Sequence, residues 1–157
     1  MKLYVLQCEN ETWYIGKTSL VPCTKRILEH FEQSQRAAAW TKINKPIDVA
    51  EIRNEVSNMD ENNLTKEYMI KYGIDKVRGG MYSQVVLPPY LKMTLTMEIN
   101  HNDNKCILCG GNHFVKDCKV PNPLNQYQCQ RCGRITHYTE QCKETTYYNG
   151  KMIYRKK

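Results

Sequence analysis

Six of the eight cysteines of this 157-residue chain lie between positions 106 and 142, and their spacing limits the fold of that region more than any other feature of the sequence. The stretch CQRCGRITHYTEQC arranges three cysteines and one histidine as Cys-x2-Cys-x4-His-x4-Cys. Three thiolates and one imidazole complete the tetrahedral shell of a structural Zn²⁺ ion and leave no open position on it. We therefore predict a structural zinc site formed by Cys129, Cys132, His137 and Cys142.

A similar array lies just upstream. The stretch CILCGGNHFVKDC follows the pattern Cys-x2-Cys-x3-His-x4-Cys, which is one residue shorter between the second cysteine and the histidine. Gly110 and Gly111 can absorb this deletion, because glycine reaches backbone conformations that are closed to other residues. The alternative is a decayed site that binds metal weakly, but we expect a second structural Zn²⁺ ion. Its ligands would be Cys106, Cys109, His113 and Cys118.

The downstream array has the spacing of the zinc knuckle of retroviral nucleocapsid proteins and many single-strand binders, which it strongly resembles. Knuckles usually offer an exposed aromatic or apolar side chain to an unstacked base and place lysine and arginine on the phosphates. Phe114 and Tyr138 each follow a ligand histidine and are the candidate stacking residues, and Ile107 is a weaker one. The candidate phosphate contacts are Lys105, Lys116, Lys119, Arg131, Arg134 and Lys143.

Charge divides the chain in the same way as the cysteines do. Residues 101–157 contain ten Lys or Arg and four Asp or Glu, a net charge of +6, whereas residues 1–100 have a net charge of +1. A basic tail on a nearly neutral body suggests a polyanionic partner. The sequence has no run of about 18 apolar residues, so we expect no membrane span. The N-terminal MKLYVLQCENE turns acidic too early for a secretory signal, and we expect an intracellular protein, nuclear or cytoplasmic.

The first half of the chain shows the periodicity of a small α+β domain. KLYVLQC and WYIGKT are separated by the polar turn ENET and predict a β-hairpin over residues 2–18. KPIDVAEIR predicts a third strand, and DKVRGGMYS reads as a loop. WYIGKT is not part of a phosphate-binding P-loop, because Glu11 stands where that motif requires its first glycine.

Two helices are predicted in the same region. DENNLTKEYMIKYG predicts a helix with Asp60 as its N-terminal cap and Gly73 as its stop. PPYLKMTLTMEIN is compatible with either a helix or a strand. SLVPCTKRILEHFEQ predicts the other helix, with a buried stripe formed by Ile27, Leu28 and Phe31.

The order of these elements, with the residues that they carry, closely resembles the GIY-YIG nuclease family. The resemblance covers residues 2–85 and rests on a first-strand tyrosine, a Tyr-Ile-Gly strand, an Arg-x3-His helix and a later helical glutamate. It implies a small three-stranded antiparallel sheet flanked by helices. Lys2-Leu3 replaces the Gly-Ile of the first motif, and the family's asparagine has no clear match, which leaves Arg78 or Ser83 as substitutes.

The resemblance also implies an activity, the metal-dependent hydrolysis of phosphodiester bonds by an endonuclease. Tyr4 would act as the general base, and Lys17 would favour its phenolate form. Arg26 would clamp the phosphate and stabilise its developing charge. Glu67 would hold a Mg²⁺ or Mn²⁺ ion that is otherwise coordinated by water and substrate oxygens. Tyr14 would position water or the phosphate. His30 would bind the phosphate or relay a proton, and Lys42 would make a further phosphate contact.

The predicted chain has four parts, and its expected partner is nucleic acid. DNA is favoured over RNA, and branched or partly single-stranded substrates are among the candidates. Two alternatives stay open: a non-catalytic nucleic-acid binder on a decayed nuclease scaffold, and an adaptor whose zinc modules bind protein. The parts are a nuclease domain (1–87), a connecting segment (88–104), tandem zinc knuckles (105–143) and a basic tail (144–157).

Overall fold

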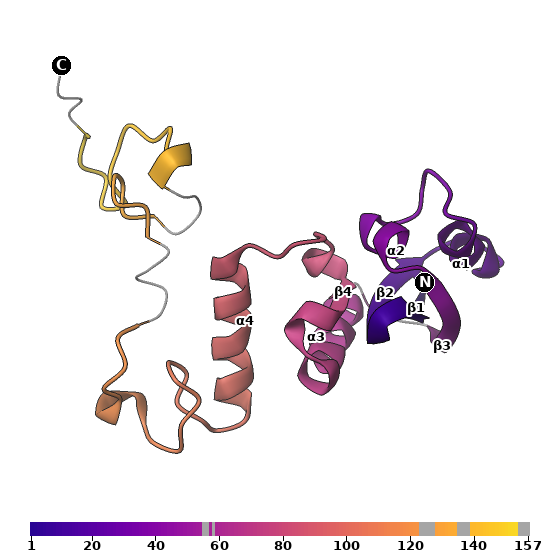
Figure 1. Cartoon of the computed structure of the whole chain (residues 1–157), viewed down its shortest axis with the longest axis horizontal. Helices are drawn as coiled ribbons and strands as arrows, with labels where there is room; N and C mark the ends of the chain where they lie inside the picture. The colour runs from indigo at the N-terminus through magenta and orange to yellow at the C-terminus, as the bar shows by residue number, and fades with distance from the viewer. Residues whose placement is uncertain (55–56, 58, 123–127, 135–138, 154–157) are drawn as a thin grey trace. The chain divides into compact units, whose positions relative to one another are not determined.

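The computed structural model describes the whole chain except residues 55–56, 58, 123–127, 135–138 and 154–157. It divides into two compact units, Met1–Leu87 and Pro88–Lys157 (Figure 1). Within the described ranges, no helix is long and apolar enough to cross a membrane. The main elements are β1 (Lys2–Cys8), β2 (Thr12–Thr18), α1 (Thr24–Phe31), α2 (Ala39–Ile43), β3 (Pro46–Asn54), α3 (Asp60–Tyr72), β4 (Val77–Gly79) and α4 (Pro89–Asn102).

The first unit is an α+β domain built on a four-stranded mixed sheet in the order β3-β1-β2-β4. β1 pairs antiparallel with both β2 and β3, which confirms the three predicted strands. β4 adds a fourth strand that runs parallel to β2 and lies in the stretch predicted as a loop. The prediction missed β4 because the strand is only three residues long and is followed by Gly80. So short a strand shows no usable alternation of apolar and polar residues.

The central strand β1 is covered on both faces, as its apolar residues predicted. Side chains alternate between the two faces of a strand, so Tyr4 and Leu6 share one face, and Leu3 and Val5 share the other. All four are essentially inaccessible to solvent. α1 and α2 pack on the Tyr4 face, and α3 packs against β2 and β4 on the opposite face (Figure 1).

Helix α1 buries Ile27 as predicted, but not the other two residues of the predicted stripe. Leu28 and Phe31 are exposed, whereas His30 is fully buried. The imidazole takes an interior position because both ring nitrogens have partners: Tyr4 Oη lies 2.9 Å from Nε2, and Thr41 Oγ1 lies 2.9 Å from Nδ1. A polar ring is tolerated in a core when its hydrogen-bonding groups are satisfied.

The two later helices follow the sequence more closely. α3 ends before Gly73, whose φ of 98° is the left-handed conformation expected of a glycine stop. Asp60 is the first helical residue rather than the N-cap, and its carboxylate accepts the amide of Ser57 at 2.6 Å. The ambiguous stretch forms helix α4, which begins with Pro89 in its first turn. Most of the predicted connecting segment is therefore helical.

Candidate active site and metal centres

The Tyr4 hydroxyl is part of a buried chain of hydrogen bonds that runs from β1 to α2. Thr41 donates its hydroxyl proton to the carbonyl of Ala38 at 2.9 Å, so its oxygen accepts the Nδ1 proton of His30. This network assigns the lone pair of the neutral imidazole to Nε2, where Tyr4 donates its own proton. The amide of Ala38 is 3.4 Å from Nδ1 and is the weaker competitor for that nitrogen.

Gly16 creates the space for the Tyr4 ring. The two residues are paired across the β1–β2 ladder, and a Cβ added to Gly16 would lie 2.5 Å from Tyr4 Cζ, inside van der Waals contact. Gly16 does not have a positive φ, so glycine is required here for the close approach and not for its backbone conformation. This contact gives a physical reason for the Tyr-Ile-Gly sequence in β2.

Tyr14 and Arg26 lie beside this chain. The Tyr14 ring centre is 6.5 Å from that of Tyr4 and 4.9 Å from that of His30. Burial raises the pKa of both tyrosines, and the Arg26 guanidinium opposes the shift by favouring the phenolate forms. The cation that acts on Tyr4 is therefore Arg26, one helical turn before His30.

Arg26 is held in place by a carboxylate and by the main chain. Its Nη1 donates to Glu29 and, at 2.8 Å, to the carbonyl oxygen of Arg36. The Arg36 guanidinium is itself 3.4 Å from Glu29, and these three residues line a surface hollow of about 440 Å³ together with Leu20. Two guanidinium groups at one hollow suit an anionic ligand such as phosphate. Sequence reasoning missed Arg36, which belongs to no motif.

The carboxylate that acts on the two tyrosines is Glu61, in the first turn of α3, and not Glu67. Glu61 Oε2 is 3.3 Å from Lys17 Nζ, and its side chain is only 13% exposed. Its charge adds to burial in raising the pKa of both tyrosines. Glu67 is exposed on another side of α3, where it acts on Arg53. Six residues turn a helix by about 600°, so the two glutamates face different surroundings.

Lys17 was predicted to favour the phenolate form of Tyr4, and the structure pairs it with a carboxylate. Alternation along β2 places it on the face opposite Tyr14, and its partner is the Glu61 carboxylate. Arg78 proves to be structural: it is 2% exposed, and its guanidinium lies 4.5 Å from the ring of Trp40. It donates hydrogen bonds to the carbonyl groups of Ile74, Val77, Gln84 and Val85.

The buried imidazole leads to a prediction about acid stability. Burial, assisted by the charge of Arg26, lowers the pKa of His30 from 6.5 to about 4. Between these pH values the unfolded chain binds a proton that the folded chain does not, so stability falls as the pH falls. We expect the first unit to lose at most about 3 kcal/mol of unfolding free energy over this range.

Urea unfolding followed by tryptophan fluorescence tests this expectation, because both tryptophans of the chain, Trp13 and Trp40, lie in the first unit. The variant His30→Asn removes the titrating group and should lose the pH-dependent part of the change between pH 6.5 and 4.5. An equally steep acid destabilisation in that variant would assign the effect to other groups.

The upstream cysteine array forms a cluster that could hold one metal ion. The donor atoms of its three cysteines and one histidine all lie within 4.8 Å of one another. Gly110 has a φ of 73° and donates its amide to Cys106 O at 2.7 Å, which closes the tight turn. Burial opposes ionisation of Cys106, but hydrogen bonds from the amides of Cys109 and Leu108 lower its pKa to about 7. The candidate ligands are Cys106, Cys109, His113 and Cys118.

The downstream array repeats this local geometry. Gly133 has a φ of 77° and donates to Cys129 O at 2.7 Å, and Cys129 N donates to Arg134 O at 2.8 Å, as Cys106 N does to Gly111 O. Amide hydrogen bonds from residues 131 and 132 lower the pKa of Cys129 to about 6 against the effect of burial. His137 and Tyr138 lie outside the described residues. The thiols within 4.8 Å of one another are Cys129, Cys132 and Cys142.

The predicted nucleic-acid contacts fall into two groups. Arg131 and Arg134 are used internally: the first donates to Cys142 O at 2.8 Å, and the second pairs with Glu144 at 2.7 Å. Phe114, in contrast, is 77% exposed, with Lys116 Nζ 5.9 Å from its ring centre.

Two further predicted lysines make local contacts. Lys105 Nζ is 3.1 Å from Asp103, and Lys42 donates to Gln35 O at 3.2 Å at the surface. The molecule thus has a tyrosine–histidine pair with nearby guanidinium and carboxylate groups in one unit and two candidate metal centres in the other.

Comparisons with protein-family models, with curated proteins and with solved structures found no significant match.

Proposed function

We propose that the chain is a metal-dependent endonuclease of the GIY-YIG type, which hydrolyses phosphodiester bonds in nucleic acid, with DNA as the proposed substrate. The observation that carries the proposal is the buried chain from Tyr4 through His30 to Thr41, with Arg26 beside it and the charge of Glu61 acting on Tyr4 from α3. Burying a hydroxyl and an imidazole in a core costs free energy that a pair of apolar side chains would not. An arrangement of this kind is typical of a proton-transfer site.

The hydrogen bond between Tyr4 and His30 provides a route for the proton of the attacking water. The raised pKa of Tyr4 disfavours a free phenolate as the resting base. A concerted transfer avoids that state: Tyr4 Oη takes a proton from the water while its own proton moves to His30 Nε2. The products are a hydroxide that attacks phosphorus and a protonated imidazole, and the phenol oxygen never carries a full negative charge. Burial and the charge of Arg26 disfavour the protonated imidazole, so the step requires the bound phosphate to offset the Arg26 charge.

The phosphate would be bound by the two guanidinium groups. Arg36 is largely exposed, whereas Arg26 is shared with Glu29, so an entering phosphate would compete with Glu29 for Arg26. Glu61 would hold the divalent cation, because Mg²⁺ typically takes one or two carboxylates and fills its other positions with water and substrate oxygens. When bound, that ion would supply positive charge at the leaving and attacking oxygens. Lys17 would then give up part of its ion pair with Glu61.

The second unit would bind the substrate through two structural Zn²⁺ ions. Cysteine sulfur and histidine nitrogen are the ligands that tetrahedral zinc prefers. The thiolate is the form of cysteine that binds a metal. The repeated turn in the two arrays supports the same role for both, despite the shorter spacing of the first. Arg131 and Arg134 would hold the second array together, while Phe114 and Lys116 would meet the nucleic acid.

The decisive test is cleavage by the zinc-loaded chain of flap, fork, nicked, duplex and single-stranded DNA, with and without Mg²⁺. We expect Mg²⁺-dependent cuts that Tyr4→Phe slows by about 10²–10³-fold, because this variant removes one oxygen but keeps the ring. The matched control is Tyr68→Phe, which also removes one hydroxyl but acts on the opposite face of the sheet, where Tyr68 packs on Trp13. Binding without cleavage of any substrate would instead support the non-catalytic alternative.

A further inference from the structure

Helix α4 and the upstream cysteine array are joined without a flexible linker. Lys105 N donates to Asn100 O at 2.8 Å, and a Cβ on Gly110 would lie 3.3 Å from Asn100 Oδ1. Between them the chain turns at Asn104, whose φ of 57° is left-handed. The last turns of α4 and the first cysteine turn therefore form one continuous surface.

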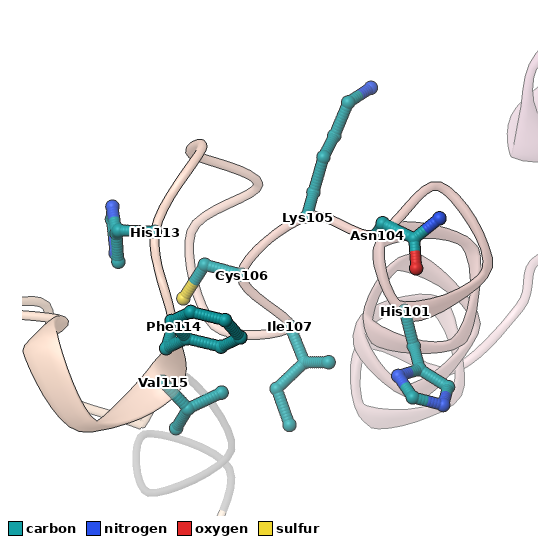
Figure 2. A pocket seen from close by; sticks show the side chains of 8 residues that line it. All are labelled: His101, Asn104, Lys105, Cys106, Ile107, His113, Phe114 and Val115. Carbon is teal, nitrogen blue, oxygen red and sulfur yellow. The ribbon is translucent and has the colours of Figure 1, made fainter.

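This surface contains two adjacent hollows that share His101 and Ile107. The first has a volume of about 450 Å³, with Phe114 and Val115 on its array side and Asn104 on its helix side, and the candidate metal ligands Cys106 and His113 also border it. Figure 2 shows the Phe114 ring and the Ile107 side chain at this hollow, with His101 projecting from α4 and Lys105 extending away. The second hollow, about 520 Å³, follows α4 and is lined in addition by Thr94, Met97 and Glu98.

We propose that the two hollows bind two successive unstacked nucleotides of a single strand, one in each, with His101 and Ile107 between them. The proposal rests on the nucleic-acid-binding role proposed above and extends it to α4, which no motif assigned to binding. Each volume lies within the range of 300–1,000 Å³ that is typical of sites for small organic ligands.

The chemistry of the first hollow suits a base better than an apolar peptide side chain. Phe114 presents an open ring face, and any base can stack on such a face whatever its sequence. The Asn104 amide and the His101 imidazole provide hydrogen-bond donors and acceptors for the edge of the base. Lys116, 5.9 Å from the Phe114 ring centre, would contact the phosphate of the same nucleotide.

The charge of this unit favours a polyanionic partner, and it indicates on which side of the hollows the phosphates of the bound strand would lie. Residues 88–157 contain eleven Lys or Arg and five Asp or Glu, a net charge of +6. In the second hollow the Glu98 carboxylate would repel a phosphate but can accept the amino group of a base. The bases would therefore point into the hollows and the phosphates away from them, where Lys116 can contact one.

The test measures binding of a short, fluorescently labelled single-stranded DNA of mixed sequence to the zinc-loaded full chain without Mg²⁺, so that no cleavage interferes. Phe114→Ala, His101→Ala and Asn104→Gly should each weaken binding by about 5- to 100-fold, as expected for lost stacking or base contacts. Asn104→Gly removes the amide but keeps the left-handed backbone. The matched control is Val120→Ala, an exposed apolar residue that lines neither hollow and should bind like the wild type.

Occupancy of both hollows has its own signature. Met97→Ala should weaken binding through the second hollow, and the fold-changes of Met97→Ala and Phe114→Ala should multiply in the double variant, because the residues act on different nucleotides. Zinc content is measured for each variant. If Phe114→Ala loses metal, the test of the two hollows rests on His101→Ala and Met97→Ala, whose residues lie on α4. A wild-type chain that binds no nucleic acid refutes the proposed function itself. If the wild-type chain binds DNA and every substituted chain binds it equally well, the two hollows are not the binding site. That result refutes only the assignment of the hollows, which would then suit a protein partner.

Discussion

Glu61→Gln should abolish cleavage, whereas Glu67→Gln should leave it at the wild-type rate, although both glutamates lie on the same helix. Glu61 is largely buried and acts electrostatically on Tyr4 and Tyr14, while Glu67 is exposed and acts on Arg53. Loss of the carboxylate proposed to hold the metal would remove the positive charge of the ion from the transition state, for which about 10²–10³-fold in rate is a typical loss. Single-turnover rates at saturating protein separate this effect from substrate binding.

The ion pair with Lys17 requires a separate control, because Glu61→Gln breaks it as well. Lys17→Met breaks the same pair but keeps the carboxylate, so it should cleave within about tenfold of the wild-type rate if the carboxylate is what matters. Tryptophan fluorescence should show the first unit folded in all three variants. If Glu67→Gln is inactive and Glu61→Gln is not, the carboxylate assignment is wrong and the prediction from sequence was right.

The sequence favoured Glu67 for an identifiable reason. The family resemblance matched Glu67 to the glutamate of a later helix, although on a helical wheel it falls between Leu64 and Ile70, at the margin of an apparent apolar stripe where a surface acid is equally expected. Leu64 is buried, but Ile70 is 51% exposed, so that stripe does not exist. The buried side of α3 consists of Leu64, Thr65 and Met69, and it includes a threonine whose hydroxyl donates to Glu61 O at 2.7 Å. A buried threonine gives no hydrophobic signal, so periodicity alone could not locate this face.

Other parts of the fold were readable because local rules decide them. The hairpin follows from two short alternating runs around a polar turn, and Gly73 ends its helix through a positive φ. The buried His30 was not predicted, because its partners come from β1 and α2, far away in the chain. The same limit applies to Arg131 and Arg134, which look like phosphate contacts in the sequence but hydrogen-bond to the main chain of their own array.

Removal of zinc from the second cysteine array should unfold that array and leave the first unit intact. Among the described residues, its buried cluster consists of Cys129, Cys132 and Cys142, with Ile153 packed against them. The candidate ligands are thus the core, and the described residues of this array contain no separate apolar cluster that would replace them without the metal. Structural zinc contributes about 10–16 kcal/mol of apparent binding free energy in isolated zinc-finger peptides, which exceeds what so small a segment gains from its other contacts.

Cys129→Ser should therefore lower the zinc content from about two ions per chain to about one, and the amide resonances of residues 129–153 should collapse towards random-coil values. Unfolding of the first unit, reported by Trp13 and Trp40, should keep its midpoint, because that unit has its own apolar core around the sheet. Cys23→Ser is the matched control, since it alters a thiol of the first unit that is not a ligand and should retain both ions. A Cys129→Ser chain that still binds two zinc ions would show that this thiol is not a ligand. A parallel loss of the tryptophan transition would show that the two units share their stability, and the substrate-binding and catalytic roles could then not be separated by deleting residues 101–157.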